Sequence, residues 1–381
     1  MSKQLLIEFE GERPALALVR DGRLLSFFPA APEAEIQAEQ VYRGVVDRIV
    51  RGMEAAFVRL GGGKMGFLPF SECKARPRSG DTVLVQVKRP PIGEKAASLT
   101  QDISLAGRFI LLTPLDARCG VSKKIEDDET RGRLLALARR LAPPGMGLVM
   151  RTESQASSEE EIAAEAEALL AKWRAIAACA LPAPCLAAGR EDALSRLLRD
   201  ERGEIAEALT NRPEALPPLP CPVRPCPQPF ALYNVAAQWE KAQRRKHWLD
   251  CGGFLILDRT EALTVFDVNS GKFTGGKAGA EATFLKLNIE AAREIARLLR
   301  LRNLGGIILI DFVDMQSEES RRAVTEALEA ALRDDPVKTA LHGFTSLGLM
   351  EMTRKKTGDI APVPTSPCPY CHGTGLREDT P

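Results

Sequence analysis

The sequence predicts an α+β protein of several domains, in which a small β-barrel precedes an α/β layer. Two observations carry this prediction. Short strands separated by glycine turns occupy residues 36–112, and apolar strands alternate with long amphipathic helices over residues 251–360. With 381 residues, the chain is long enough for about two or three domains.

The composition is that of a globular protein, with 45% hydrophobic and 27% charged residues. No apolar run approaches the roughly 20 residues that span a bilayer, and the first residues do not resemble a secretory signal, so we expect a cytoplasmic protein with no membrane segment. Nine irregularly spaced cysteines do not indicate a secreted disulfide framework. A net charge of +1 leaves any nucleic-acid-binding surface to local basic clusters.

The first 112 residues are predicted to be mostly strands. Residues 1–35 contain three short apolar strands, which need further strands to pack on. Segments rich in β-branched residues then alternate with glycines, a pattern typical of a small closed barrel. The segments that carry this prediction are residues 41–50, 55–60, 66–69 and 82–87.

Helices enter after the barrel. Residues 113–175 combine short strands with a helix near 130–141 and a second, alanine-rich helix. Residues 176–250 are rich in proline and predict a connector with one short helix near 191–210, followed by a helix over 231–246.

The α/β layer of residues 251–360 is the most regular part of the sequence. Its helices are predicted over 281–301 and 317–333, and its last strand near 345–352. Residues 361–381 form a tail that contains a Cys-x-x-Cys motif.

Asp267 and Asp311 are the first candidate site residues, because each ends an apolar strand of this layer. Polar residues at the C-terminal ends of such strands lie where α/β proteins form ligand sites, and carboxylate oxygens suit Mg²⁺. Asn269 points to the same side as Asp267 if the strand continues. The alternative is that each aspartate only caps a turn.

Phe57 and Phe67 lie on consecutive predicted strands of the barrel. Small barrels of this kind bind single-stranded nucleic acid by stacking bases on exposed aromatic rings. The alternative is that both rings belong to the core of the barrel.

Cys368 and Cys371 have the spacing of half a zinc site, and a closed zinc site needs four ligands. His372 is a possible third ligand, whereas Cys221 and Cys226 have a poor spacing. Two chains that each donate a cysteine pair would also complete the site, and a reduced pair without metal is the remaining alternative.

Arg151 and Thr152 follow a predicted strand and form a reasonable phosphate-binding pair, although such pairs are usually plain surface residues.

Together, these segments resemble the bacterial ribonuclease E/G family, in a short form without C-terminal extensions. The resemblance rests on six motifs in the family's order: residues 54–58, 66–69, 260–264 with 267–269, 288–306 with 310–315, 348–354 and 368–371.

The resemblance implies a fold for each region. An S1-type (OB-fold) RNA-binding barrel is expected at 36–112 and a 5′-phosphate sensor-like subdomain at 113–175. A degenerate RNase H-like piece would combine 1–35 with a shortened 176–250. A DNase I-like catalytic subdomain is expected at 251–360, and a zinc-link loop at 361–381.

The resemblance also implies a magnesium-dependent endoribonuclease that hydrolyses single-stranded RNA to 5′-phosphate and 3′-hydroxyl ends, in rRNA processing or mRNA decay. Its implied catalytic residues are Asp267, Asn269 and Asp311, of which the two aspartates bind Mg²⁺. The implied structural Zn²⁺ is shared between two subunits through Cys368 and Cys371. RNA-binding residues would be Phe57, Phe67 and Lys95, and 5′-phosphate pocket residues Gly120, Arg151, Thr152 and Lys338. The rival interpretation is a non-catalytic S1-type RNA-binding protein associated with transcripts or ribosomes.

Three departures from the family pattern bear on these expectations. The segment after Thr152 is acidic, residues 153–230 are short and rich in proline, and Lys338 stands where an arginine is expected. The sequence ends ten residues after Cys371, so we expect a homodimer and not a tetramer.

The zinc hypothesis predicts a stoichiometry. If two chains share one ion, the protein holds about half a zinc ion per chain, and the Cys368→Ser, Cys371→Ser double variant is a monomer with impaired cleavage. Native mass spectrometry measures both quantities. A monomer that holds about one zinc ion per chain would contradict the shared site.

Overall fold

The computed structural model describes residues 2–30, 36–91, 95–201, 205–260, 262–271 and 280–357. The described residues fall into two compact units. One is formed by residues of Met1–Phe9, Ala17–Phe28 and Ile205–Pro381, and the other by residues of Glu10–Leu16 and Pro29–Glu204.

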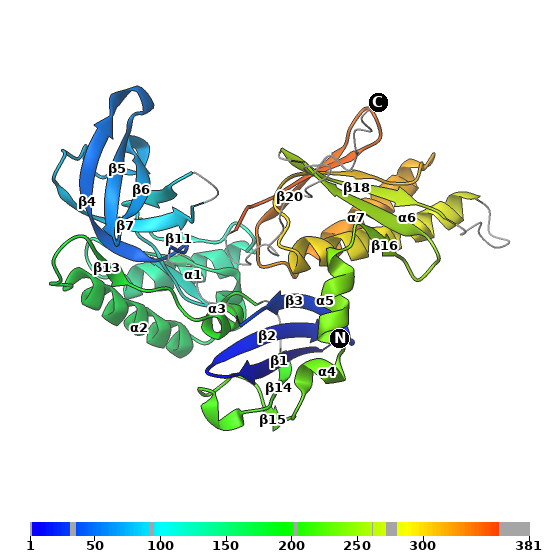
Figure 1. The fold of residues 1–381 in the computed structure, drawn as a ribbon, viewed down its shortest axis with the longest axis horizontal. Coiled ribbons are helices and arrows are strands. Elements are labelled where there is room, and N and C mark those ends of the chain that lie inside the picture. Colours follow the sequence, from blue (N-terminus) through cyan, green and yellow to red (C-terminus); the bar gives the residue numbers. More distant parts are fainter. Residues whose placement is uncertain are drawn as a thin grey trace, which may run out of the picture. The chain divides into compact units, whose positions relative to one another are not determined.

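The second unit contains the predicted barrel, which is confirmed as five strands that close on themselves (Figure 1). The strand order is β4 (Val41–Val50), β5 (Ala55–Gly61), β6 (Lys64–Pro69), β8 (Ala97–Thr100) and β7 (Thr82–Arg89), and β7 pairs back with β4. Strand β13 (Cys185–Ala188) adds to β4. Gly66 is required inside the barrel, because a Cβ there would lie 2.4 Å from the side chain of Leu99.

The same unit contains a small α/β layer. Its sheet has the order β11 (Gly120–Val121), β12 (Gly147–Met150), β10 (Ile110–Thr113) and β9 (Leu105–Ala106). Helices α1 (Asp128–Leu141) and α2 (Glu159–Ala177) pack their apolar faces on it, and α3 (Ala193–Asp200) follows. Helix α2 begins at a capping box in which Ser158 and Glu161 satisfy one another's backbone N–H groups.

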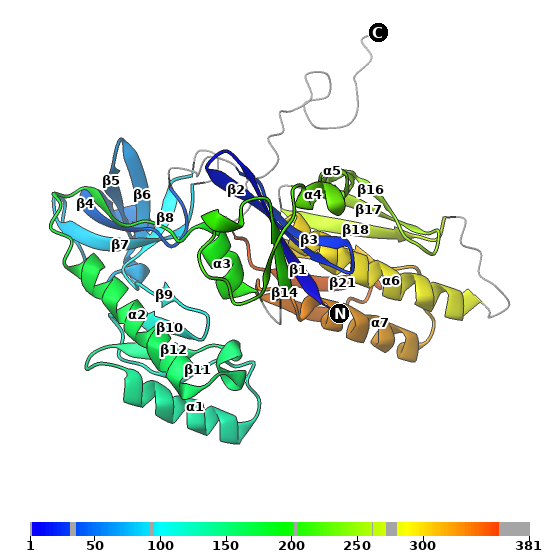
Figure 2. The same ribbon diagram turned by 90° about the horizontal axis from the view of Figure 1, so that it is seen from below.

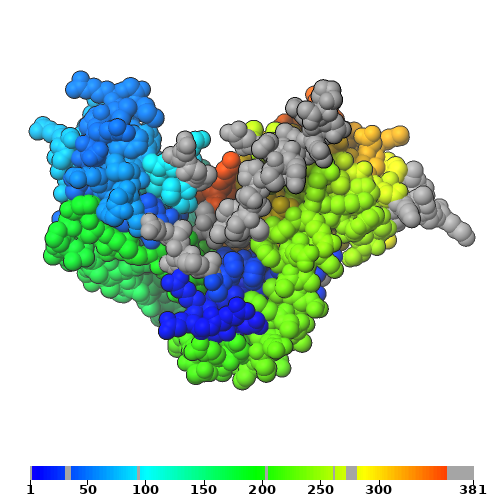
Figure 3. Space-filling view, in the orientation of Figure 1, coloured from blue at the N-terminus to red at the C-terminus, as the bar shows by residue number. Residues whose placement is uncertain are grey.

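The first unit contains a five-stranded sheet, in the order β15 (Val223–Pro225), β14 (Ile205–Thr210), β1 (Lys3–Glu10), β2 (Arg13–Arg20) and β3 (Arg23–Phe28). Strand β14 pairs in parallel with β1, so blue N-terminal residues adjoin green residues in the space-filling view (Figure 3). For residues 176–250 we expected a connector with one short helix, and that expectation did not include strand β14. This pairing joins segments about 200 residues apart, which leaves no local pattern to recognise.

The other sheet of this unit carries the candidate site. Its order is β16 (Lys246–Trp248), β17 (Phe254–Arg259), β18 (Leu263–Asn269), β19 (Gly306–Asp311), β21 (Met350–Arg354) and β20 (Thr339–Phe344). Helices α6 (Ala280–Leu301) and α7 (Glu318–Leu332) lie side by side along it (Figures 1 and 2). Because β18 and β19 are parallel, α6 forms the crossover between them.

Two elements differ from the sequence prediction. The helix expected over 231–246 is divided into α4 (Pro229–Leu232) and α5 (Val235–Gln243), because Asn234 adopts a left-handed conformation with φ of 50°. The strand expected near 345–352 is instead a turn followed by β21, and Gly348 has φ of 82° in that turn. No helix among the described residues combines the length and apolarity that a membrane crossing requires.

Candidate functional site

The two sides of the six-stranded sheet differ in chemistry. Phe266 and Val268 of β18 and Ile310 of β19 are buried in the core that includes α6 and α7. Side chains of a strand alternate between faces, so Asp267 and Asp311 lie on the opposite, open face, where both are exposed. This open face is the candidate site.

The strand register brings the two aspartates together. Asp267 and Asp311 are directly paired Cα positions of the parallel strands β18 and β19. Neighbouring strands are about 4.8 Å apart, so both carboxylates occupy one small region. Asn269 belongs to the same face, and its Nδ2 donates a hydrogen bond to Oδ2 of Asp267 at 2.9 Å. The three candidate catalytic residues are therefore adjacent in the structure.

Negative charge accumulates at this point. Partial burial raises the pKa of Asp311, and the charges of Asp267 and Asp314 raise it further. Ionised carboxylates at this distance repel one another, which a cation between them would relieve.

Asn288 positions the segment that follows Asp311, a role that the sequence analysis did not recognise. This fully buried residue of α6 donates from Nδ2 to the carbonyl oxygen of Val313 at 2.8 Å. The N–H of Val313 donates in turn to Oδ1 of Asn288 at 3.1 Å. An amide among apolar residues of a core helix was the available signal, since a buried polar group needs a partner.

The donor set suits Mg²⁺, which is usually bound by one or two carboxylates and keeps several waters. Asp267 and Asp311 supply such a pair of oxygen ligands. Within the part of the chain that the structure describes, no group of three or more His, Cys, Asp or Glu side chains is arranged to hold a metal ion. The pair fits an ion that also binds water and substrate, and it does not form a closed protein cage.

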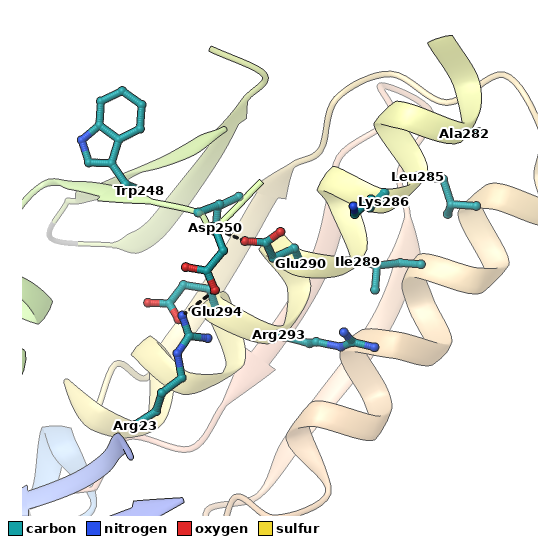
Figure 4. Close-up of a pocket in the computed structure, with 11 residues that line it drawn as sticks. Arg23, Trp248, Asp250, Ala282, Leu285, Lys286, Ile289, Glu290, Arg293 and Glu294 are labelled. Carbon is teal, nitrogen blue, oxygen red and sulfur yellow. Dashed lines mark hydrogen bonds and ion pairs between the residues drawn. The ribbon is translucent and has the colours of Figure 1, made fainter. Parts of the chain in front are cut away.

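A pocket of about 500 Å³ lies on the other side of the sheet, against α6 (Figure 4). Trp248 also borders this pocket, and some of the pocket's polar groups are engaged in interactions. Arg23 pairs with Asp250 at 3.3 Å, and the N–H of Cys251 donates to Glu290 at 3.2 Å. Because α6 covers the face opposite Asp267, this pocket is separate from the carboxylate pair.

The barrel places Phe57 and Phe67 opposite one another on β5 and β6, with ring centroids 5.7 Å apart. Both rings are half-buried, whereas Val58 and Leu68 next to them fill the core. The guanidinium of Arg48 lies 4.8 Å from the centre of the Phe57 ring. Lys95 is exposed and lies two residues before β8. The barrel thus has an aromatic pair outside its core.

The candidate phosphate pocket contains an internal ion pair. Arg151 donates from its guanidinium to Oδ1 of Asp200 at 3.1 Å and to the carbonyl oxygen of Gly107. Burial favours a higher pKa for Asp200, but the hydrogen bond from Arg199 and the charges of Arg199 and Arg151 outweigh it, so the pKa is lowered. An ionised Asp200 therefore competes with any phosphate for Arg151.

The other predicted pocket residues are distributed differently. Gly120 on β11 pairs with β12, whose end leads into Arg151 and Thr152, so these three lie in one subdomain. Lys338 is exposed before β20 and belongs to the other compact unit. The expected zinc ligands Cys368 and Cys371 lie outside the described residues.

The raised pKa of Asp311 predicts an effect on stability. A carboxyl with a raised folded-state pKa destabilises the folded protein while it is ionised, and this cost disappears as the pH falls through that pKa. We expect Asp311→Asn to raise the free energy of unfolding at neutral pH, with a gain that fades in acid.

The stabilisation that Mg²⁺ gives against thermal unfolding should differ between the parent and Asp311→Asn. At about 100 times its Kd, Mg²⁺ should stabilise the parent by about 2.7 kcal/mol and the variant much less. Thermal unfolding with and without Mg²⁺ measures this, with Glu326→Gln on the exposed side of α7 as the control. Equal stabilisation of parent and Asp311→Asn would show that the ion binds elsewhere.

The chain is similar to known proteins of one family. A model of the ribonuclease E/G family matches residues 104–219 and 223–357. Ribonuclease G of Salmonella typhimurium (strain SL1344) and of Escherichia coli (strain K12) are each 36% identical, over 98% of this chain and 84% of theirs. Ribonuclease E of Escherichia coli (strain K12) is 35% identical over the whole chain, which spans 39% of that longer protein. Since the family model covers more than half of the chain and these relatives align with nearly all of it, the chain belongs to the ribonuclease E/G family.

Proposed function

We propose that this endoribonuclease of RNA processing or decay hydrolyses single-stranded RNA to 5′-phosphate and 3′-hydroxyl ends, with Mg²⁺ held by Asp267 and Asp311. Its membership of a ribonuclease family supports the reaction class. The observation that carries the assignment of the site is the direct pairing of Asp267 with Asp311 on the open face of the sheet.

The chain's own residues prepare the site for a phosphodiester. Asp267 and Asp311 provide the negative oxygens that hold the ion, and Asn269 orients the Asp267 carboxylate through its 2.9 Å hydrogen bond. Asn288 fixes the backbone after Asp311, so the second carboxylate is held in place as well. When bound, Mg²⁺ supplies a water of lowered pKa and offsets the charge that develops on the phosphate.

The expected subdomains fit the same proposal. The closed barrel corresponds to an S1-type RNA-binding domain with Phe57 and Phe67 as base-stacking residues, helped by Lys95. The six-stranded sheet with α6 and α7 corresponds to a DNase I-like catalytic subdomain. The sheet of β1–β3 with β14 and β15 corresponds to the RNase H-like piece. A zinc-linked homodimer through Cys368 and Cys371 belongs to the same proposal.

A cleavage assay tests the reaction. Asp267→Asn should abolish Mg²⁺-dependent cleavage of single-stranded RNA, while RNA affinity stays the same or rises slightly, because a negative charge facing phosphate is removed. Glu326→Gln serves again as the control. Cleavage at the parental rate would refute the assignment, and a parent that binds RNA without cutting it would favour the non-catalytic S1-type interpretation.

The barrel rings predict a binding defect. Phe57→Ala or Phe67→Ala should weaken the binding of unstructured RNA by roughly 1–3 kcal/mol for each lost stack, with the fold intact. Fluorescence anisotropy with a labelled oligonucleotide measures the affinity, and circular dichroism monitors folding. Unfolding of either variant would instead assign the rings to the structural core.

The ion pair of Arg151 predicts a weak preference for a 5′-monophosphate. The carboxylate of Asp200 already pairs with the guanidinium of Arg151. Asp200→Asn should therefore increase the ratio of cleavage rates between 5′-monophosphate and 5′-hydroxyl substrates, with Arg151→Gln, Asp200→Asn as the control that loses the gain. A large preference in the parent, or none in Asp200→Asn, would contradict this role.

A further inference from the structure

We infer that Trp248, Phe254 and Lys246 form a stacking platform for an unpaired base of the RNA substrate, beside the carboxylate pair. The inference rests on the proposed function, because it places substrate RNA on the open face of the six-stranded sheet. It adds a second aromatic binding site, on a different compact unit from the barrel.

Strand register places this platform on the open face. Trp248 pairs with Phe254 across β16 and β17, and Phe254 pairs with Asn269 across β17 and β18. Directly paired residues of neighbouring strands point to the same side of a sheet. Trp248 also borders the pocket against α6, but in Figure 4 its ring points away from that helix. Trp248 is therefore two strands from Asn269, about 10 Å, within reach of a nucleotide that flanks the scissile phosphate.

The three side chains already form one cluster. The rings of Trp248 and Phe254 are edge-to-face, with centroids 5.3 Å apart. The Lys246 ammonium lies 4.2 Å from the centroid of Trp248 and 3.6 Å from that of Phe254. Aromatic faces for a base, together with a cation for its phosphate, are the combination that single-strand binding surfaces use.

The exposure of Trp248 needs an explanation that the fold does not supply. Its exposed fraction is 65%, whereas Trp173 is 8% exposed and Trp239 packs against the core. Strand β16 is at an edge of the sheet, where a lysine is ordinary protection against pairing with other chains. A large exposed aromatic ring has the opposite effect, so edge protection accounts for Lys246 and not for Trp248.

A base on this platform would help to place the phosphate near Asp267. Ile256 of β17 pairs with both Lys246 and Asp267, so the row from the platform to the carboxylates is continuous across the sheet. Stacking accepts every base, because each has a π-face. The platform therefore raises affinity for single strands without strong sequence preference.

Binding of single-stranded oligo(A) tests the inference, with Asp311→Asn as the background so that the RNA stays intact. Trp248→Ala should lower affinity by about 5- to 150-fold, whereas Trp248→Phe should bind nearly as the parent does. Trp248→Leu keeps an apolar side chain without a π-face and should resemble Trp248→Ala. Leu232→Ala, another exposed apolar residue, is the matched control and should have no effect.

Two further measurements identify the contact itself. RNA should quench tryptophan emission in the background protein, and Trp248→Phe should lose that quenching while it keeps its affinity. Lys246→Gln should reduce the slope of log affinity against log salt by about 0.7, the value for one phosphate contact on a single strand.

Several results would overturn the platform. These are parental affinity in Trp248→Ala, equal affinity of Trp248→Leu and Trp248→Phe, or unchanged emission on RNA binding. A change in oligomeric state in Trp248→Ala, with RNA affinity unaltered, would make Trp248 a protein-contact residue instead. Cleavage by the protein with native Asp311 is measured separately, so failure of the nuclease proposal is distinguishable from failure of the platform.

Discussion

The parallel pairing of β18 with β19 is the constraint on which the candidate site depends. It sets Asp267 opposite Asp311, and a shift of one residue would turn one of these carboxylates into the core. The register is held from the other side of the sheet, where Phe266 and Ile310 are fully buried. Burial of large apolar side chains thus determines where the acidic residues lie.

The two faces of this six-stranded sheet have different roles, one in stability and the other in the candidate site. The helix-covered face buries the apolar side chains that hold the subdomain together, and the open face gathers acidic and aromatic groups. Carboxylates at one point weaken the fold, as the raised pKa of Asp311 indicates. Asn288 lies in the core, and its side-chain amide forms two hydrogen bonds with the backbone of Val313. The core therefore holds the segment between Asp311 and Asp314 in place.

An ion pair within the chain changes the phosphate binding that the family pattern implies for Arg151. Arg151 occupies the position expected for a phosphate-binding residue, yet its guanidinium is engaged by Asp200, which also pairs with Arg199. An arginine that already has an acidic partner binds an added anion less strongly, because the phosphate must displace that partner. We therefore expect Arg151 to bind phosphate less strongly than its position in the motif implies.

The sequence by itself determined the family, the barrel, the α/β layer and the strands that carry Asp267 and Asp311, because these depend on local periodicity and short motifs. It did not determine the pairing of β14 with β1, the break at Asn234, or the partners of Asn288, Arg151 and Trp248. Those features depend on contacts between residues distant in sequence or on a single backbone angle. Only the tertiary structure brings such groups together, since strand register and side-chain packing decide which faces and charges meet.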